Sequence, residues 1–406
     1  MVPVSSWIDS SCDLGTMSSL LSLPDEVLKL LMQQLPTKDR LTSCCLVNMR
    51  LHAAAVAATD DLHLLGIRHG ESSLQWLSHY GKYVTRLALG CFQKPLQQVP
   101  CPALLELDLG RSFEHCSVQL GPAGGYAGVV RSCPKLTRLE LHCCDIIDTP
   151  AGDVLDSLSS LVHLQHLKVQ TYTYPSRWYA IGGLSEATLP CLAHLTYLEA
   201  GNLSTDNLAQ LGALTELQEL CLPMHMTSKS DQVVPSMPGL VLPASLTKLL
   251  LECDVEAGLL SIVPAGLRVL EVSTVVGPVE GPGSLFAYIA ELQQLMKLEV
   301  WPFDGAWPPA GPAYSSLTAS SSLGSLLMWH SNLPAEVWPH VFPASRKLLQ
   351  LTCLEFGDDW GAFDLPSAWG QRTCLGLSAA APTFARLTVC LCSVGRMCLS
   401  CKSSWL

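Results

Sequence analysis

Positive charge is scarce in this sequence, and charge of either sign is sparse. The 406 residues include 24 lysine and arginine residues against 35 aspartate and glutamate residues, and only 15% are charged. The formal net charge is −11, and no run of basic residues offsets it. Because an acidic chain is repelled by phosphate groups, direct binding to nucleic acid or to an anionic membrane surface is disfavoured.

Long apolar runs and targeting signals are also missing, although 49% of the residues are hydrophobic and the mean hydropathy is +0.30. The most apolar stretch, residues 258–279, is interrupted by Arg268, Glu271 and two prolines. A membrane-spanning helix needs about 20 consecutive apolar residues. The first 15 residues contain neither a basic segment nor an apolar core, which predicts no secretion signal. We therefore expect a cytoplasmic or nuclear protein whose 18 scattered cysteines are reduced and mostly buried.

Recognisable catalytic motifs are also scarce in the sequence. There is no glycine-rich phosphate loop, no histidine pair at metal-binding spacing and no nucleophile elbow. Arg68-His69-Gly70-Glu71 resembles the nucleophile motif of histidine phosphatases, but the start of a helix over residues 72–80 is the simpler interpretation. We predict that the protein is not an enzyme and holds no cofactor and no metal.

Four cysteines close to the C-terminus have spacings found in zinc sites. Their thiolates could hold a tetrahedral zinc ion. No histidine joins them, and an apolar strand-like cap or an unstructured tail explains the same residues more simply. The four are Cys390, Cys392, Cys398 and Cys401.

A six-residue unit with the pattern apolar-x-x-Leu-x-apolar organises most of the chain. Consecutive units begin between 20 and 33 residues apart. So many matches to one pattern indicate an internal repeat, in which each repeat supplies a short strand whose apolar residues face inward and stack on its neighbours. The units begin at Val84, Leu104, Leu136, Leu164, Leu195, Leu217, Leu246, Leu267, Leu295, Leu323, Leu351 and Phe384.

This pattern resembles the leucine-rich-repeat family over about three quarters of the chain. The resemblance implies an α/β fold in which the repeats stack into a horseshoe-shaped solenoid with one strand per repeat on the concave side. We assign residues 84–357 to the repeats, and residues 358–406 to a degenerate last repeat, a cap or a tail. The uneven spacing predicts an irregular solenoid with variable segments on the convex side.

Alternation along each strand predicts which residues line the concave face. Counted from the first apolar residue of a unit, the third, fifth and seventh positions point away from the core. Carboxylates are frequent at the fifth position, and two seventh positions hold tryptophan. We predict a target-binding set of Asp108, Glu140, Glu199, Glu271, Glu299, Glu355, Trp301 and Trp329. Two interpretations stay open: a negative stripe with aromatic anchors that captures a basic partner segment, or a solvated face neutralised by lysine and arginine at the third position.

A leucine-rich stretch ahead of the repeats predicts three short helices. Ser22, Pro24 and Asp25 offer a capping hydroxyl, an early-helix proline and an N-terminal carboxylate in the order that starts a helix. The proline at position 36 ends that helix, and two more are expected over residues 38–47 and 47–58. Apolar residues fall on more than one face of the fragment.

Residues 23–55 resemble an F-box, with Leu51 at the place where that family often has tryptophan. Members of the family bind a Skp-type adaptor, which links them to a cullin ubiquitin ligase. The adaptor-binding residues implied by the resemblance are Leu23, Pro24, Val27, Leu28, Leu31, Leu35 and Val47. The alternative is that the helices only cap the first repeat, because the end of a repeat array needs a cover.

These observations lead to one domain scheme and two alternative functions. We expect a disordered segment over residues 1–20, the F-box over 21–60 and a linker or N-terminal cap over 61–83. The order of an F-box followed by leucine-rich repeats predicts the substrate-recognition subunit of an SCF-type ubiquitin ligase, which holds an unknown target protein on the repeats. The alternative is a non-catalytic leucine-rich-repeat scaffold with no role in ubiquitination.

Overall fold

A computed structural model describes the chain in a set of ranges that starts at residue 20 and ends at residue 393. These ranges are 20–41, 48–64, 70–89, 101–109, 132–142, 157–170, 188–200, 208–222, 233–234, 241–276, 284–300, 312–329, 338–343, 349–358 and 388–393. The chain divides into two compact units, Met1–Asp148 and Thr149–Leu406, called unit 1 and unit 2 below.

Unit 1 contains a helical fragment, made of α2, α3 and α5, and a parallel sheet. Its helices are α2 (Asp25–Gln33), α3 (Thr37–Asp39), α5 (Met49–Ala57), α6 (Gly70–Tyr80) and the 3-10 helix η4 (Gly81–Tyr83). Its strands are β1 (Asp61–Leu64), β2 (Arg86–Leu89), β3 (Glu106–Leu109) and β4 (Arg138–His142). The strands pair in parallel in this order, β1 with β2, β2 with β3 and β3 with β4.

The first helix begins later than the sequence predicts. Pro24 occupies the N-cap of α2 and makes no side-chain cap, so Ser22 is not the capping residue. Asn48 does cap α5, because its side chain accepts a hydrogen bond from the backbone N–H of Arg50 at 2.7 Å. Asparagine at an N-cap is a strong helix-start signal that the sequence-based boundary at residue 47 overlooked.

Unit 2 repeats one strand and one short helical segment. Its strands are β5 (His166–Gln170), β6 (Tyr197–Ala200), β7 (Glu219–Leu222), β8 (Val233–Val234), β9 (Lys248–Glu256), β10 (Val269–Val276), β11 (Lys297–Val300), β12 (Ser325–Trp329), β13 (Cys353–Asp358) and β14 (Thr388–Ser393). Its helical segments are η5 (Ser157–Ser160), α9 (Thr188–Cys191), η6 (Leu211–Ala213), η7 (Ala257–Ile262), α11 (Leu285–Glu291), η8 (Pro312–Thr318) and α12 (Trp338–Val341).

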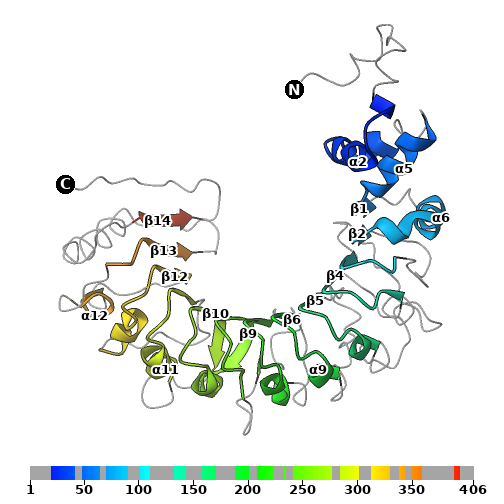
Figure 1. Cartoon of the computed structure of the whole chain (residues 1–406). Helices are drawn as coiled ribbons and strands as arrows, with labels where there is room; N and C mark the ends of the chain where they lie inside the picture. The colour runs from blue at the N-terminus through cyan, green and yellow to red at the C-terminus, as the bar shows by residue number, and fades with distance from the viewer. Residues whose placement is uncertain are drawn as a thin grey trace. The chain divides into compact units, whose positions relative to one another are not determined.

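The strands of unit 2 pair in parallel in chain order, except that β7 pairs with β9 and the two-residue β8 joins β9 from the side. The short helical segments follow the opposite side of the repeats from the strands (Figure 1). Parallel neighbours of this kind need a crossover segment between consecutive strands. One strand and one crossover per repeat make this a leucine-rich-repeat solenoid, as the sequence predicts.

The register explains why the repeated leucines form one core. Fourth-position leucines lie opposite each other on adjacent strands, as Leu270 does with Leu249 on one side and Leu298 on the other. Wherever the side chain is described, the first, fourth and sixth positions of the units that begin between Val84 and Leu351 are buried. The expected inward-facing positions are therefore confirmed for these units.

Threonines reinforce the turn that enters several of the strands. The carbonyl group of a second-position residue accepts backbone hydrogen bonds from the second and third residues of the next unit, as the Gln218 carbonyl does from Thr247 and Lys248. Where the second residue is threonine, its hydroxyl donates to the same carbonyl, at 3.2 Å for Thr247. The other threonines with this bond are Thr85, Thr137, Thr196 and Thr352.

The last repeat is out of phase with its sequence match. In the pairing of β13 with β14, Leu354 lies opposite Val389. The unit proposed to begin at Phe384 would have placed Leu387 there, two residues earlier. The weak match at this end of the repeats was therefore aligned wrongly, because Val389 is as apolar as the leucine that the pattern seeks.

Candidate protein-binding surfaces

Unit 2 presents charged residues on the strand side that does not face the core. They stand at the third, fifth and seventh positions of β5 to β11, where alternation turns side chains away from the leucines. We call this set the charged strand face. It comprises Lys168, Glu199, Glu219, Lys248, Glu252, Glu271, Lys297 and Glu299.

Most of these charges meet on neighbouring strands. Lys297 donates hydrogen bonds to Glu271 at 2.7 Å and lies 2.9 Å from Glu299. Lys168 lies 2.9 Å from Glu199. Lysines therefore neutralise the carboxylates over much of this face. This is the second of the two interpretations that the sequence left open.

Neutralisation is incomplete, because the set holds five carboxylates and three lysines. Lys248 pairs with Glu219 at 3.0 Å. The pKa of Glu252 lies above its ordinary value, because partial burial and the negative charges of Glu199 and Glu271 disfavour its ionised form. A cation brought to Glu252 would relieve that repulsion.

An aromatic pair adjoins these charges. The Tyr197 ring stacks on the ring of His166, with centroids 4.1 Å apart and planes 9° from parallel. The Tyr197 hydroxyl donates to Glu199 at 2.6 Å, and burial together with this carboxylate raises the pKa of the tyrosine. Tyr197 is therefore a fixed, neutral aromatic group beside acidic residues.

The predicted target-binding residues fall into three groups. Glu199, Glu271 and Glu299 belong to the charged strand face of unit 2. Glu355 and Trp329 lie in strands β13 and β12, where only the backbone is described, and Trp301 lies outside the described residues. Asp108 and Glu140 belong to unit 1.

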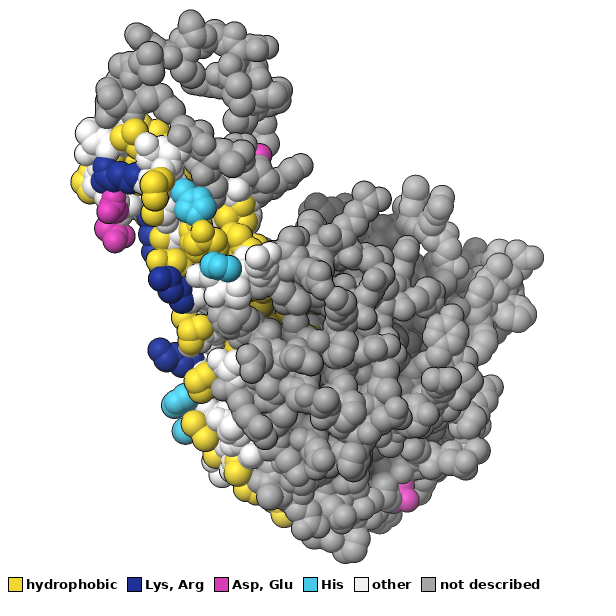
Figure 2. Space-filling model, turned by 90° about the vertical axis from the view of Figure 1, so that its right-hand side faces the viewer, with side chains coloured by type: hydrophobic (Ala, Val, Ile, Leu, Met, Phe, Trp, Pro, Cys, Tyr) yellow, Lys and Arg dark blue, Asp and Glu magenta, His cyan; other side chains and the backbone are white. Residues whose placement is uncertain are grey.

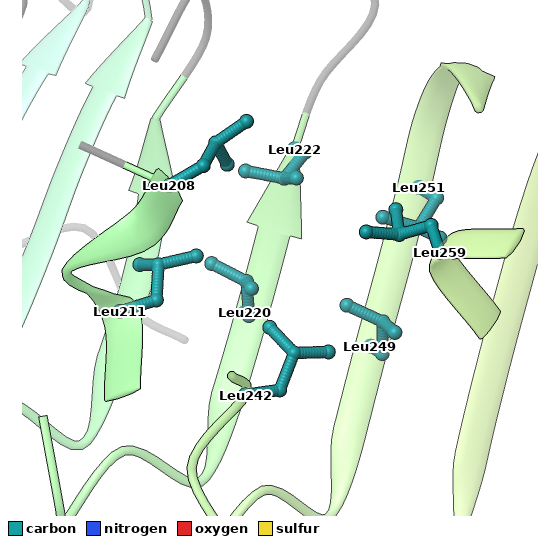
Figure 3. Close-up of a pocket in the computed structure, with 8 residues that line it drawn as sticks. All are labelled: Leu208, Leu211, Leu220, Leu222, Leu242, Leu249, Leu251 and Leu259. Atoms are coloured by element: carbon teal, nitrogen blue, oxygen red, sulfur yellow. The ribbon is translucent and has the colours of Figure 1, made fainter. Parts of the chain in front are cut away.

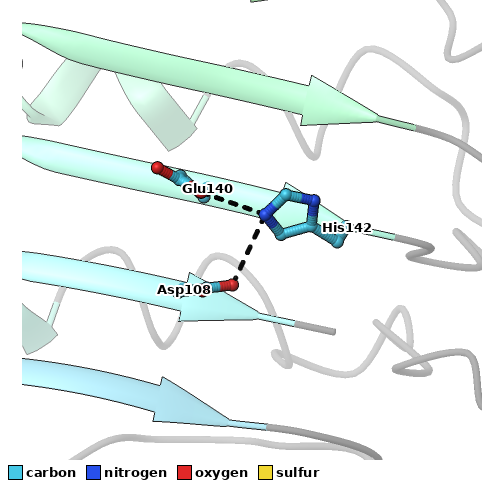
Figure 4. A group of neighbouring side chains, drawn as sticks. All are labelled: Asp108, Glu140 and His142. Atoms are coloured by element: carbon cyan, nitrogen blue, oxygen red, sulfur yellow. Dashed lines mark hydrogen bonds and ion pairs between the residues drawn. The ribbon is translucent and has the colours of Figure 1, made fainter. Parts of the chain in front are cut away.

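In unit 1, Asp108 and Glu140 share a histidine that the sequence analysis left aside (Figure 4). Nε2 of His142 lies 3.0 Å from Oε2 of Glu140 and 3.6 Å from Oδ1 of Asp108. All three side chains are largely buried, with 14–16% of their surface exposed. Strand pairing brings Asp108 and Glu140 together, because they are register partners on β3 and β4.

The helical fragment exposes part of its apolar surface. Leu28 and Met32 of α2 pack against α5 in a core with Leu51 and the alanines of that helix. On the same helix Val27, Leu30 and Leu31 remain exposed, as does Met49 at the start of α5, which is 90% exposed. Figure 2 shows hydrophobic side chains at the surface of this fragment.

The described members of the adaptor-binding set implied by the F-box resemblance differ in exposure. Val27, Leu31 and Pro24 are exposed, whereas Leu23 and Leu35 pack partly against the core. Leu28 is fully buried, so its side chain offers no surface to an adaptor. Val47 lies outside the described residues.

Arg50 holds the start of α2 against α5. Its guanidinium donates to Oδ1 of Asp25 at 2.7 and 2.9 Å, to the Leu23 carbonyl at 2.7 Å and to the Leu21 carbonyl. Both carbonyls precede Asp25, the first residue of α2, so Arg50 ties the chain ahead of that helix to α5. The fork shape of arginine lets one side chain reach all three acceptors.

A small void in unit 2 lies among leucines alone (Figure 3). Its volume is about 10 Å³, near the lower limit for one water molecule. An apolar lining offers a water no hydrogen bonds, so the void is a packing gap and not a ligand site. The lining residues are Leu208, Leu211, Leu220, Leu222, Leu242, Leu249, Leu251 and Leu259.

Several sequence-based suggestions fall at the limits of the described ranges. Arg68 and His69 lie outside them, and helix α6 begins with Gly70, where the sequence analysis expected a helix start. Cys398 and Cys401 also lie outside, while Cys390 and Cys392 are described only as backbone of β14. Within the described helices, none is long and apolar enough to cross a lipid bilayer.

No protein-family model matches the sequence, and no curated protein sequence matches it. Solved structures with some similarity include an internalin, InlF, from Listeria monocytogenes, with 14% identity and a TM-score of 0.37 over 79% of this chain and 89% of the other. The leucine-rich repeat-containing protein LegL7 from Legionella pneumophila has 14% identity and a TM-score of 0.37 over 67% and 90%.

The functional domain of InlJ from Listeria monocytogenes, described as including a cysteine ladder, has 15% identity and a TM-score of 0.34. The match covers 68% of this chain and 50% of that one. Likenesses of this size are too weak to carry conclusions about this protein. The repeat architecture follows instead from its own strand register and buried leucines.

Proposed function

We propose that the protein is a non-catalytic interaction protein whose charged strand face binds a basic segment of a partner protein. The observation that carries this proposal is the excess of negative charge on the face, five carboxylates against three lysines, and the raised pKa of Glu252 beside Glu199 and Glu271 agrees with it. The face's own lysines leave negative charge uncompensated there. A partner's lysine or arginine would supply the missing cation and gain electrostatic complementarity.

The aromatic pair supports the same proposal. Tyr197 and His166 form a flat, stacked platform next to the acidic residues. Tyrosine is enriched at the centres of protein interfaces, because it supplies a large contact area at low cost in conformational entropy. A basic segment that also carries an apolar or planar side chain would use both features.

Peptide arrays test this proposal directly. Arrays of lysine- and arginine-rich peptides and of matched acidic peptides are probed with the full-length protein and with Glu252→Lys. We expect binding to a subset of basic peptides that Glu252→Lys weakens by tenfold or more, which is about 1.4 kcal/mol. The control is Glu291→Lys, because Glu291 is an exposed carboxylate at the end of α11, away from the strand face.

Two outcomes would reject basic-segment binding. One is a loss of binding with Glu291→Lys that equals the loss with Glu252→Lys, because net charge alone would then explain it. The other is a preference for acidic peptides. Raising the salt concentration should weaken true binding, since part of it comes from screened charges.

The second candidate is the substrate-recognition subunit of an SCF-type ubiquitin ligase. A specific observation favours it: α2 leaves Val27, Leu30 and Leu31 exposed, and Met49 lies exposed at the start of α5. Leucine and methionine at the surface of a small helical fragment suit a contact with a helical adaptor. In this function the charged strand face would hold the target, and the helical fragment would hold the Skp-type adaptor.

Co-expression with a Skp-type adaptor tests the second candidate. Leu31→Ser should abolish co-purification, whereas Leu105→Ser should not, because Leu105 is similarly exposed but lies in the repeats. Both substitutions remove an exposed leucine, so they are matched in their effect on solubility. Failure of the unaltered protein to co-purify would reject the ligase function and leave the first proposal standing.

A further inference from the structure

We propose that Asp108, Glu140 and His142 of unit 1 form a binding site for a zinc ion. The three side chains bring two carboxylates and one imidazole together, with one ligand atom from each lying within 4.8 Å of the others. The cluster is distinct from the charged strand face, which belongs to unit 2. The proposal therefore does not depend on the proposed partner binding.

The backbone places these groups on one side of the sheet. Asp108 and Glu140 are register partners on the parallel strands β3 and β4. His142 follows Glu140 by two residues, which in a strand returns a side chain to the same face. No loop is needed to assemble the cluster, so its geometry is as rigid as the sheet.

The distance between His142 and Asp108 fits two ligands on one zinc ion, while His142 and Glu140 are within hydrogen-bond distance. Zinc binds histidine nitrogen and carboxylate oxygen at about 2.0–2.2 Å in a tetrahedral arrangement, which places ligand atoms about 3.3–3.6 Å apart. Nε2 of His142 lies 3.0 Å from Glu140 and 3.6 Å from Asp108. The second distance is too long for a hydrogen bond but fits two ligands on one metal.

The ligand set favours zinc over calcium and magnesium. An imidazole nitrogen disfavours calcium and magnesium, which take oxygen ligands. Two carboxylates and one neutral histidine match the mixed nitrogen and oxygen sets of zinc sites with three protein ligands, in which the fourth position is left for water. The ion would also offset the repulsion between two carboxylates on adjacent strands.

Arg138 orients one of the ligands. Its guanidinium donates to Oε1 of Glu140, with Nε at 2.8 Å, while Oε2 is the oxygen that faces His142. Metal-binding carboxylates are commonly held in this way by an outer hydrogen bond. Zinc and a proton compete for Nε2 of His142, so the affinity for zinc should fall as the pH falls.

Zinc titration of the full-length protein tests the site. Exposed thiols are first alkylated without denaturant, because cysteines also bind zinc, and binding is then measured by calorimetry. We expect one zinc equivalent that weakens by roughly tenfold or more in both Asp108→Asn and His142→Ala. The matched control is His63→Ala, since His63 pairs with a single carboxylate, Asp61, at 3.0 Å in the same unit.

Two results would overturn the proposal: no zinc binding by the unaltered protein, or equal affinity in the parent and the two variants. Asp108→Asn keeps the shape of the side chain, so it decides the matter if His142→Ala fails to fold. X-ray absorption at the zinc edge of the unaltered protein gives an answer that needs no variant. A shell of nitrogen and oxygen with one imidazole supports the site, and a sulfur shell rejects it.

Discussion

The helical fragment of unit 1 and the repeats of unit 2 use leucine in opposite ways. In unit 2 the first- and fourth-position leucines of every described repeat are buried. In helix α2, Leu28 is fully buried, whereas Leu30 and Leu31 on the same helix are 60% and 43% exposed. The leucines of the repeats thus build the core, whereas only some leucines of the helical fragment are buried in its core.

The difference comes from how each region is built. Stacked repeats give every residue at a given position the same surroundings, so one pattern determines burial throughout. A nine-residue helix that packs on one partner can bury only one side. Apolar residues on its other side stay exposed, and they are the ones free to contact another protein.

The largest expected effect is the loss of a repeat leucine. Leu298→Ala should lower the free energy of unfolding by about 2–5 kcal/mol, because the side chain is fully buried and truncation leaves a cavity. Leu30→Ala should change it by no more than about 0.5 kcal/mol. Urea unfolding followed by circular dichroism measures both. Equal losses for the two variants would remove the distinction between the regions.

The buried leucines of the repeats could be predicted from the sequence, and their polar neighbours could not. Period-two alternation places Glu271 and Glu299 on the charged side without any knowledge of the fold. The bond from Lys297 to Glu271 depends on the register of β10 with β11, which brings the two strands' side chains together. The pattern therefore identifies the acidic residues but not the partners that neutralise them.

The cluster of Asp108, Glu140 and His142 in unit 1 could not be predicted from the sequence either, because Asp108 lies far from the other two along the chain. Asp108 and His142 belong to different repeats, and the intervening segment has no regular length. A seventh-position histidine next to a fifth-position carboxylate was the available signal. Metal ligands that lie close together along the chain can be recognised in a sequence, whereas this set is brought together only by the pairing of β3 with β4.

In the helical fragment, the F-box resemblance implied that Leu28 and Leu31 contact the same partner. Both fall within the apolar spacing of a helix, and the sequence offers nothing to separate them. Packing against α5 determines which of the two leucines is buried, because Leu28 lies in the core with Leu51 and the small alanines of that helix. Which side of a short helix is buried is decided by its neighbour.

A second prediction concerns the polar side of the repeat strands. Lys297→Met should destabilise unit 2 by about 2 kcal/mol, since the largely buried Glu271 and Glu299 lose a shared cation. Lys248→Met is the matched control. Its pair with Glu219 is more exposed and should contribute no more than about 1 kcal/mol. Thermal unfolding of both variants checks this, and equal losses would show that burial does not matter.

The pH dependence of Lys297 follows from its surroundings. Burial lowers the pKa of this lysine, but hydrogen bonds to Glu271 and Glu299 more than offset that effect, so its pKa is raised. The stabilisation is therefore fully present below the ordinary lysine pKa of about 10.4 and is lost as the pH rises through the higher value in the folded protein. The difference in the free energy of unfolding between the parent protein and Lys297→Met should therefore become smaller in strongly alkaline solution. A constant difference would contradict this assignment.

A fourth prediction compares two glycines on the repeats. A Cβ atom at Gly212, in η6, would lie 3.0 Å from the backbone oxygen of Val241, whereas one at Gly266 would meet nothing within 4 Å. Gly212→Ala should cost about 1–3 kcal/mol through overpacking. Gly266→Ala should be neutral or stabilise by up to about 1 kcal/mol, because it restricts the unfolded chain. Chemical denaturation separates them, and a loss at Gly266 would show that this turn is tighter than described.

The smallest expected effect concerns the Arg50 contacts, which hold the helical fragment together where it has no stacked leucines. Arg50 bonds Asp25 and the carbonyl groups of Leu21 and Leu23. Arg50→Lys keeps the charge but loses the fork, so we expect a loss of about 1 kcal/mol. Asp25→Asn, which leaves the bonds to the carbonyls in place, should cost less, because the pair is exposed. Hydrogen exchange of α2 amides gives the local stability. If Asp25→Asn cost more than Arg50→Lys, the surface ion pair and not the carbonyl contacts would anchor the helix.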